Sequence, residues 1–385
     1  MRAIVGHSDD VYVDDAIAEI LSQCERDLAG ECPKGGVLYS TKEYDAGRVL
    51  AAIERRWPGV PLVGASTAGE MSSRLGFRED SICLTLFAGA DVEVRASKGE
   101  NAVADLARAL DDVVAGLGSG RPALCVLIAP ATVSVSDVLR GLHSRLGERS
   151  CPIVGGLSGD HTLSRDTWQF FGSEALQDSL TVLALHGDFS VGVGVASGWF
   201  PIGARHTVTR SEGAAVYEID GKPAIEMYQG FWNDRVTGNL GEFPLAVLDS
   251  QDPAKFVLRA AMVIDSDAGC VRFAGDVPQG AQVCLTEVVP DGLLSGTRES
   301  LREALGNFHG TQPEVALLFS CAARKWVLGT RAKEEMDQFL ASIEELAQAK
   351  LPLAGFYAFG EISPLAATGA PVLHNETCVT VLVGR

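Results

Sequence analysis

The chain alternates short apolar runs with segments in which apolar residues recur every three or four positions. The helical spacing is found at residues 12–29, 101–117, 136–147 and 334–349. Apolar runs of strand length lie between these segments, namely "GGVLYS", "SICLTLF", "ALCVLIA", "SLTVLAL", "EVALLFS" and "TCVTVLV". Strands that alternate with amphipathic helices predict the mixed α/β class.

One short phrase occurs three times. "PLVGASTAGE" at 61–70, "PIVGGLSGD" at 152–160 and "PLAGFYAFGE" at 352–361 share a proline, a glycine three residues later and a final glycine followed by an acid. Each follows a strand and an amphipathic helix, and each precedes "EDSICLTLF", "QDSLTVLAL" or "NETCVTVLV". Self-similarity of this kind predicts a repeated strand-helix-strand-strand unit with an acidic turn.

The repeat leads us to expect two halves, residues 1–215 and 216–385, divided near the polar stretch "TRSEGAAVYEIDGKP". Each half is expected to hold a mixed β-sheet flanked by outer helices, and the acidic turns are expected to approach a shared cleft. Tyr228 and Trp232, spaced as on one helix face, predict a helix that joins the halves.

Composition excludes several classes of partner. The 385 residues are 46% hydrophobic and 21% charged, which is an ordinary globular composition. With 50 acidic against 32 basic residues the net charge is −18, so nucleic acid and anionic membrane surfaces are not expected partners. The long apolar stretch after residue 178 is interrupted by His186 and Asp188 before it reaches membrane-spanning length.

The termini and cysteines predict the compartment. The N-terminal "MRAIVGHSDD" has no secretory signal pattern, so a cytoplasmic location is expected. The nine cysteines include no C-x-x-C pair, and four of them lie inside apolar runs. These four are Cys83, Cys125, Cys284 and Cys378. The pattern favours reduced core thiols over a disulfide framework or a metal site.

The third phrase offers a candidate ligand site. Pro352 begins a strand, Gly355 allows a close approach of another chain segment, and Gly360 permits a turn that presents Glu361 at the strand end. A carboxylate there suits an ammonium group, and amide or hydroxyl donors suit a carboxylate. The candidate partners of Glu361 on nearby elements are Tyr357, His374, Asn375 and Thr377.

The other two phrases add further candidates. Ser66, Thr67 and Glu70 occupy the matching turn of the first phrase, and Asp160 and His161 occupy that of the second. A purely structural interpretation stays open at this point. In that interpretation the glycines serve turns, Glu361 caps backbone amides, and His374 is a strand-end histidine with satisfied hydrogen bonds.

These same residues resemble the FIST domain, a sensory module with an N-terminal and a C-terminal part. The resemblance rests on "PLVGASTAGE", on "GFYAFGEISP" and on "LHNETCVTVL", and it extends over most of the chain. It identifies residues 1–215 as similar to the FIST N-terminal part and residues 216–385 as similar to the C-terminal part.

The resemblance implies a small-molecule sensor in signal transduction, with an amino-acid-like ligand. The chain has no recognisable kinase, cyclase, methyl-accepting or F-box segment, so any signal is expected to pass to a separate protein such as a histidine kinase or a cyclase. Some family members bind haem and respond to nitric oxide, which is the alternative. None of the seven histidines has a diagnostic neighbour, so no cofactor is expected, with haem left as an alternative.

An enzyme is the second alternative. Glu361 with His374 forms an acid/base pair on paper, and Glu70 with Asp160 offers two carboxylates. The sequence lacks G-x-S-x-G, a lysine-bearing phosphate loop and H-E-x-x-H. No complete catalytic set is present, so a binding protein without catalytic or metal-ligating residues is the prediction.

Overall fold

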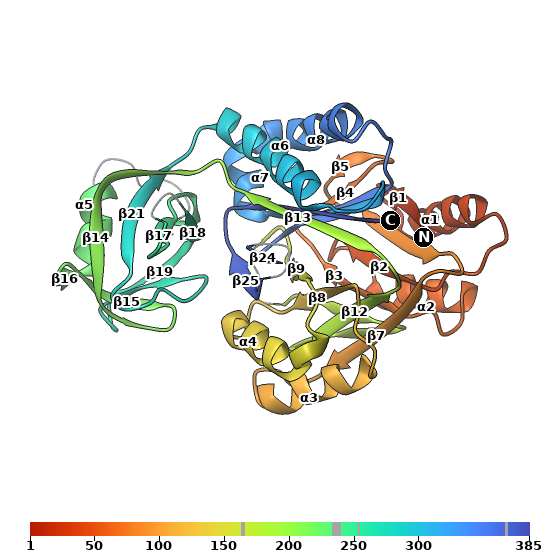
Figure 1. Cartoon of the computed structure of the whole chain (residues 1–385), viewed down its shortest axis with the longest axis horizontal. Coiled ribbons are helices and arrows are strands. Elements are labelled where there is room, and N and C mark those ends of the chain that lie inside the picture. Colours follow the sequence, from red (N-terminus) through yellow and green to blue (C-terminus); the bar gives the residue numbers. More distant parts are fainter. Residues whose placement is uncertain (163–165, 233–239, 253–254, 366–368) are drawn as a thin grey trace.

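A computed structural model describes residues 1–162, 166–232, 240–252, 255–365 and 369–385. It confirms the mixed α/β class: a large body holds three six-stranded sheets with helices outside them, and a smaller β-rich unit lies at one end (Figure 1). The six expected strands and the four expected helices are all present, with ends shifted by a few residues.

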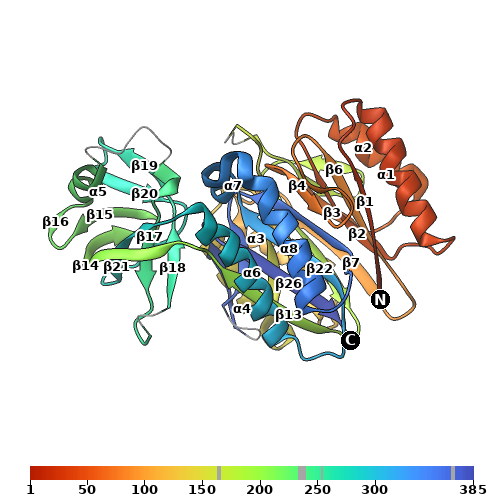
Figure 2. The same cartoon turned by 90° about the horizontal axis from the view of Figure 1, so that it is seen from above.

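The first sheet has the strand order β1-β6-β2-β3-β10-β11. Its strands are β1 (Arg2–Ser8), β2 (Gly35–Ser40), β3 (Leu62–Ser66), β6 (Ile82–Ala88), β10 (Gln169–Phe171) and β11 (Glu174–Leu176). The helices α1 (Val13–Leu28) and α2 (Ala46–Arg56) lie on its outer face (Figure 2). In α1 the buried Ile17, Ile20 and Cys24 share one face, as their spacing predicts.

The second sheet has the order β7-β12-β8-β9-β24-β25. Its strands are β7 (Glu93–Gly99), β8 (Leu124–Ala129), β9 (Ile153–Leu157), β12 (Leu180–His186), β24 (Glu361–Pro364) and β25 (Pro371–His374). Its outer helices are α3 (Leu106–Gly116) and α4 (Val135–Leu146), followed by the short 3-10 turn η1 (Gly147–Arg149). Asp105 and Ser134 cap the N-termini of these two helices by accepting backbone N–H groups.

The third sheet has the order β13-β26-β22-β23-β4-β5. Its strands are β4 (Glu70–Ser72), β5 (Gly76–Arg78), β13 (Ser190–Ala196), β22 (Pro313–Cys321), β23 (Leu353–Ala358) and β26 (Cys378–Gly384). Its helices are α6 (Pro290–Asn307), α7 (Ala322–Leu328) and α8 (Ala332–Leu346), with the 3-10 turn η3 (Gly329–Arg331) between the last two.

The three sheets exchange hairpins in a ring. The hairpin β4-β5 follows β3 in the chain but pairs with β23 of the third sheet. The hairpin β10-β11 follows β9 but pairs with β3 of the first sheet, and β24-β25 follows β23 but pairs with β9 of the second. Each sheet is therefore completed by a segment that belongs in sequence to another one.

The glycine three residues after the proline in each phrase has a packing role. Gly64, Gly155 and Gly355 lie in β3, β9 and β23, beside the parallel strands β2, β8 and β22. A Cβ at any of the three would collide with a leucine carbonyl oxygen of the neighbouring strand. The repeated glycine therefore permits close contact between two backbones rather than a turn.

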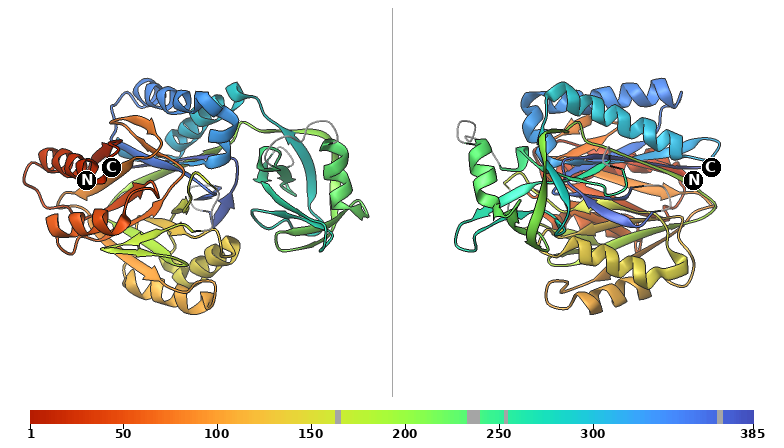
Figure 3. Two further views of the ribbon diagram at one scale, coloured as in Figure 1. Left: turned by 180° about the vertical axis from the view of Figure 1, so that it is seen from behind. Right: turned by 60° about the vertical axis from the view of Figure 1, so that its left-hand side comes forward.

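The inner faces of the three sheets share one core. Tyr39 of β2, Ile128 of β8, and Phe319 and Phe356 of the third sheet belong to one hydrophobic cluster. The rings of Tyr39 and Phe356 lie 4.5 Å apart between centroids. Because the outer faces are covered by helices, the apolar strands are buried on both sides (Figure 3).

The smaller unit is inserted between β13 and α6. An eight-stranded sheet forms it, in the order β18-β17-β21-β14-β15-β20-β19 with β16 beside β15. Its strands are β14 (Phe200–Glu212), β15 (Ala215–Ile219), β16 (Lys222–Pro223), β17 (Leu245–Leu248), β18 (Phe256–Arg259), β19 (Ala261–Asp265), β20 (Cys270–Phe273) and β21 (Gln282–Glu287). It also contains α5 (Ala224–Trp232) and η2 (Leu240–Glu242).

This insertion changes two expectations. The expected division at 215/216 falls at the start of β15, inside the smaller unit. The helix expected to join two halves is α5, which instead packs within that unit, where the buried Tyr228 ring lies 5.9 Å from Phe273. The spacing of the apolar residues predicted the buried face of α5, but it could not predict which sheet covers that face.

Candidate functional site

The turns after β3, β9 and β23 meet at one end of the body, which we call the loop end. Each of these strands runs parallel to its neighbour, so both strands of a pair deliver their carboxyl ends to the same side. Backbone hydrogen bonds link the turns in a closed ring: Gly159 N–H to Ser66 O, Ala68 N–H to Tyr357 O, and Phe359 N–H to Leu157 O. Candidate side chains from three distant segments are thereby brought together.

Glu70 and Glu361 begin the exchanged hairpins and are fully buried. Glu70 accepts the N–H and the hydroxyl of Ser81, and the hydroxyl of Thr67. Glu361 accepts the N–H of Thr377 at 3.1 Å and its hydroxyl at 2.7 Å. Both acids thus cap the backbone just before a strand, β6 or β26, which is the structural alternative raised from the sequence.

The second repeat unit of the chain has a glutamine at this position, on a strand that pairs in the first sheet. Gln169 is the first residue of β10 and pairs with Ala65, the residue after the repeated glycine of β3. Glu70 and Glu361 pair with the equivalent residues of β23 and β9, Phe356 and Gly156. The Gln169 side-chain carbonyl accepts the N–H of Ser179 at 3.1 Å. The sequence phrases align Asp160 with the two glutamates, and that alignment is wrong, because the hairpin of the second unit begins at Gln169 and not at Asp160.

Burial controls the protonation of these groups. It raises the pKa of Glu70 and of Glu361 from 4.5 to about 8, against the lowering effect of their hydroxyl and N–H donors. Burial likewise lowers the pKa of His374 to about 4. At neutral pH the glutamates therefore hold protons and the imidazole is neutral.

Charged side chains of both signs gather at the loop end. We name the group formed by Lys42, Glu79, Asp80, Asp160, His161 and Lys325 the loop cluster. Lys325 Nζ donates to the Ala68 carbonyl at 2.7 Å and to Glu79 at 2.9 Å, and it lies 3.3 Å from Nδ1 of His161. Only 7% of the Lys325 side chain is exposed, so three partners hold this ammonium group in place.

The remaining members of the loop cluster complete the contacts. Lys42 Nζ lies 3.5 Å from a carboxylate oxygen of Asp160, which also accepts the N–H of Thr162. His161 Nε2 lies 3.2 Å from Asp80, without the alignment of a hydrogen bond. The cluster draws Lys42, Glu79 and Asp80 from the first unit of the chain, Asp160 and His161 from the second, and Lys325 from the middle of α7.

Tyr357 is part of a separate buried network. Its hydroxyl donates to Glu335, which pairs with Arg324 at 2.6 Å. Arg324 also donates to Ser320, to Thr297 and to the Leu293 carbonyl, and both charged side chains are inaccessible to solvent. These contacts join β22, β23, α6, α7 and α8, so the network holds the third sheet to its helices.

The other predicted residues are also placed. His374 faces Glu361 across the β24-β25 ladder, but its Nε2 contacts Ser363 and not the carboxylate. The Asn375 amide oxygen accepts the N–H of Ala260 from the smaller unit at 3.4 Å. Ser66 is buried, and its hydroxyl accepts the N–H of Trp168. Glu361 and Thr377 are thus in contact, whereas Tyr357 and His374 have other partners.

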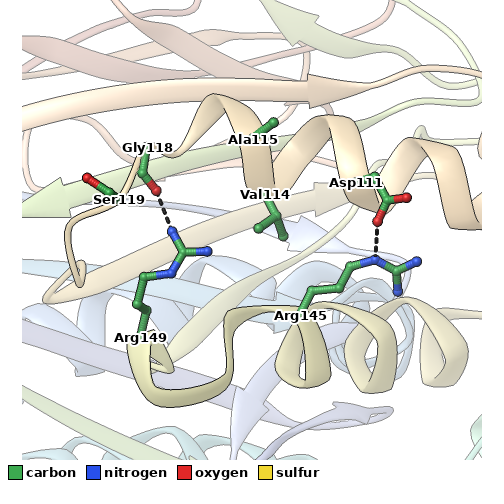
Figure 4. A pocket seen from close by; sticks show the side chains of 7 residues that line it. All are labelled: Asp111, Val114, Ala115, Gly118, Ser119, Arg145 and Arg149. Atoms are coloured by element: carbon green, nitrogen blue, oxygen red, sulfur yellow. Dashed lines mark hydrogen bonds and ion pairs between the residues drawn. The ribbon is translucent and has the colours of Figure 1, made fainter.

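Two surface cavities lie away from these residues. The larger, of about 670 Å³, lies between α3 and α4, where Arg145 pairs with Asp111 and Arg149 donates to the Gly118 carbonyl (Figure 4). The second, of about 410 Å³, is lined by residues of β1 and by Arg74 and Lys350. Neither cavity is lined by a histidine or by a predicted ligand-binding residue, although Pro352 at the start of the third phrase lines the second cavity.

The two most deeply buried histidines, His7 and His374, have rings that contact serines. His7 is engaged on both ring nitrogens and His374 on Nε2. An axial haem ligand needs a free ring nitrogen beside an apolar slot, which His7 does not offer.

Sequence reasoning missed six residues at the loop end. These are Lys42, Glu79, Asp80, Gln169, Lys325 and Glu376. The acid of "NET" stands where "EDS" and "QDS" also have an acid, so the repeat carried a signal for Glu376. Gln169 has no such signal, because an amide and a carboxylate look unlike in sequence while accepting the same hydrogen bond.

Comparison with known proteins agrees with the motifs. Residues 35–222 match the FIST N domain, and residues 224–364 match the FIST C domain. The chain belongs to the FIST family. FIST domains are associated with sensory signal transduction. The junction of the two matched regions lies between β16 and α5, so it falls inside the inserted unit of this FIST protein.

Relatives cover the whole FIST chain. An uncharacterized protein of Mycobacterium tuberculosis is 27% identical over 404 aligned residues, which cover 99% of each chain. An uncharacterized protein of Mycobacterium bovis is 26% identical over 386 residues and 95% of each chain. An uncharacterized protein of Methanocaldococcus jannaschii is 31% identical over 81 residues, 21% of this chain and 16% of that one.

Among solved structures, a cyanuric acid hydrolase from A. caulinodans aligns over 100% of this chain and 98% of its own, with 9% identity and a TM-score of 0.36. A score of this size supports no conclusion on fold or activity. Among the described residues, no helix combines the length and apolar character needed to cross a membrane.

Proposed function

We propose that this FIST protein is a sensory module that binds a small amino-acid-like ligand at the loop end and passes the signal to a separate protein, such as a histidine kinase or a cyclase. The observation that carries the proposal is the loop cluster. It places two ammonium groups, Lys42 and Lys325, beside the carboxylates of Asp160 and Glu79, and the turns of all three sheets meet there.

The chemistry of the loop cluster suits a zwitterion. An ammonium side chain that is already positioned can accept a carboxylate of the ligand without ordering a free lysine, which reduces the entropic cost of binding. Asp160 and Glu79 supply acceptors for N–H groups. Carboxyl ends of parallel strands are also where α/β proteins commonly bind ligands.

A ligand screen tests this proposal. The purified chain is heated with each of the common amino acids, and binding to the native state raises the melting temperature. Isothermal titration then gives the affinity for wild type and for Lys42→Ala. Loss of a charged hydrogen bond is expected to weaken binding about ten- to a hundredfold.

The control is Lys350→Ala, because that side chain is 86% exposed and away from the loop end. It is expected to bind like the wild type. If no amino acid stabilises the protein, the proposed ligand class is wrong. If an amino acid binds but Lys42→Ala and Lys350→Ala behave alike, the loop cluster is not the site.

A further inference from the structure

Glu70, Gln169 and Glu361 each begin an exchanged hairpin, and they differ in how many of their side-chain polar atoms have a hydrogen-bond partner. Glu70 has donors on both oxygens, from Thr67 and Ser81. Gln169 has partners on both terminal atoms, since its amide nitrogen donates to Ser158 at 2.7 Å and its oxygen accepts from Ser179. Glu361 is bonded only through Oε2, and its buried Oε1 has no hydrogen-bond partner among the described residues.

A single substitution within the repeat explains the difference. The carbonyls that accept in the ring of backbone hydrogen bonds belong to Ser66, Leu157 and Tyr357. The residue that follows is Thr67 in the first unit, Ser158 in the second and Ala358 in the third. Alanine has no hydroxyl to donate. The third unit therefore keeps the acid but lacks the hydroxyl partner that the first two units have, which donates to Glu70 in the first unit and accepts from Gln169 in the second.

A second position shows the same contrast. Asp80, Asp178 and Glu376 each precede the capped Ser or Thr, and all three have left-handed backbone, with φ of 49°, 50° and 60°. Asp80 accepts from the Thr41 hydroxyl, and Asp178 accepts the N–H of Val103 at 2.9 Å.

Glu376 is fully buried, and neither of its oxygens has a hydrogen-bond partner among the described residues. Cys321 takes the place of Thr41 in the third unit. The Thr41 N–H donates to the Ser81 carbonyl, and the Cys321 N–H donates to the equivalent carbonyl of Thr377. A thiol is a much weaker donor than a hydroxyl.

Among the described residues, Arg324 is the positive charge that acts on both acids. Its recorded hydrogen bonds go to Glu335, Thr297, Ser320 and two carbonyls rather than to Glu361 or Glu376. Two other titratable groups interact with the pair. The Cys321 thiol is a weak donor that lowers the pKa of Glu361, and Glu242 comes from η2 of the smaller unit. The described His, Cys, Asp and Glu residues form no group able to hold a metal ion.

We propose that Glu361 and Glu376 together form a receptor for the primary ammonium group of the ligand. Three carboxyl oxygens that receive no N–H or O–H donor from the described residues, Oε1 of Glu361 and both of Glu376, match in number the three N–H donors of an ammonium group. Burial without a partner is costly for such oxygens, and a cation with donors removes that cost. This inference rests on the proposed function, because it names which residues hold the amine of the ligand.

Binding is coupled to proton release. Burial raises the pKa of Glu361 to about 8, so this carboxyl of the empty receptor holds its proton at neutral pH, and burial also raises the pKa of Glu376 well above 4.5. An ammonium group favours the ionised carboxylates, so protons leave as it binds. Titration calorimetry in two buffers of different ionisation enthalpy at pH 7 measures the number released, and amine binding without proton release contradicts the receptor.

The decisive variant supplies the missing donor. Ala358→Ser places a hydroxyl beside Glu361 Oε1, at the position from which the Thr67 hydroxyl donates to Glu70 in the first unit. We expect it to raise the melting temperature of the unliganded protein and to weaken amino-acid binding about tenfold or more. Glu376→Gln is expected to weaken binding similarly. The matched control is Ser158→Ala, which removes the corresponding hydroxyl of the second unit and should lower the melting temperature while leaving affinity unchanged.

Ligand analogues separate the two proposals. The amino acid that stabilises the wild type most is compared with its N-acetyl derivative, which lacks the ammonium group. Strong binding of the amino acid and loss of binding on acetylation support the receptor. If the N-acetyl derivative binds equally, or if Ala358→Ser and Glu376→Gln bind like wild type while Lys42→Ala does not, the receptor is wrong and the loop cluster stands. If no amino acid binds, both proposals fail.

Discussion

Glu70 and Gln169 hold the same place in two different sheets. Each opens an exchanged hairpin strand, and each accepts the backbone N–H of a serine, Ser81 at 3.3 Å and Ser179 at 3.1 Å. Each also bonds a hydroxyl of the preceding turn, Thr67 or Ser158. A protonated carboxyl and an amide thus perform one structural function, which is to tie a hairpin to the start of a neighbouring strand.

Replacement of Glu70 tests this equivalence. Glu70→Gln keeps an acceptor for Ser81 and is expected to retain the free energy of unfolding within about 1 kcal/mol at pH 7. Glu70→Ala leaves buried donors without a partner and should lower it by about 1–3 kcal/mol. Urea denaturation followed by circular dichroism measures both. Equal losses in the two variants would show that the hydrogen bonds at this position do not stabilise the fold.

The raised pKa values predict a stability that falls with rising pH. The folded protein keeps protons on Glu70 and Glu361 up to about pH 8, whereas the unfolded chain loses them near 4.5. Since the folded state binds more protons in this window, each group lowers the free energy of unfolding by about 1.4 kcal/mol per pH unit.

The best range for the measurement is pH 6.5–8. Below 6.5, the buried neutral His374, whose pKa falls from 6.5 to about 4, opposes the carboxyls, because the unfolded histidine gains a proton first. Urea midpoints should decrease from pH 6.5 to 8 in the wild type and decrease less steeply in Glu70→Gln. A flat profile would mean that these glutamates are already ionised at pH 6.5.

The buried pair of Arg324 and Glu335 predicts a large mutational effect. Glu335→Ala leaves the Arg324 guanidinium buried without its anion and should cost about 3–5 kcal/mol. Arg298→Ala is the control, because its partner Glu345 is 61% exposed and the loss should be below about 1 kcal/mol. Denaturation midpoints distinguish the two, and a small effect of Glu335→Ala would show that water reaches the pair.

The repeated glycine offers a test of the strand contacts. Gly355→Ala forces a methyl group against the Leu318 carbonyl of the adjacent strand and should destabilise the protein by about 1–3 kcal/mol or more. Gly306→Ala, with open space around the added carbon in α6, should be neutral or stabilising. Thermal melts of the two variants suffice. A tolerated alanine at 355 would mean that β22 and β23 can separate at little cost.

Much of the fold could be predicted from local patterns. The strands Gly35–Ser40 and Leu180–His186 are continuous apolar runs, and helix α1 has its apolar residues on one face, so period and length identified them. The hairpin exchange could not be predicted, because Glu70 is close in sequence to β3 yet pairs with β23, almost three hundred residues later. Nothing in a local window specifies such a partner.

The candidate site could be predicted only in part, because a local sequence pattern does not show which distant segments meet. Glu70 and Glu361 were recognised from the glycine and acid that recur, and both lie at the loop end. Lys42 and Lys325 were not, since no repeat marks them and only the ring of turns brings them near Asp160 and His161. Tyr357 was expected beside the ligand, but its hydroxyl is bonded to Glu335, which lies on α8.

The exchange of hairpins has a consequence for how the chain can be divided. A fragment that stops at residue 215 would lack β24, so β9 would have an unpaired edge, and the β4-β5 hairpin would have no β23 to join. Neither family region is then a self-sufficient folding unit, whatever the boundaries drawn along the sequence. During synthesis, the earliest sheet must wait for a hairpin made much later, and premature termination should yield aggregation-prone edges rather than a small working sensor.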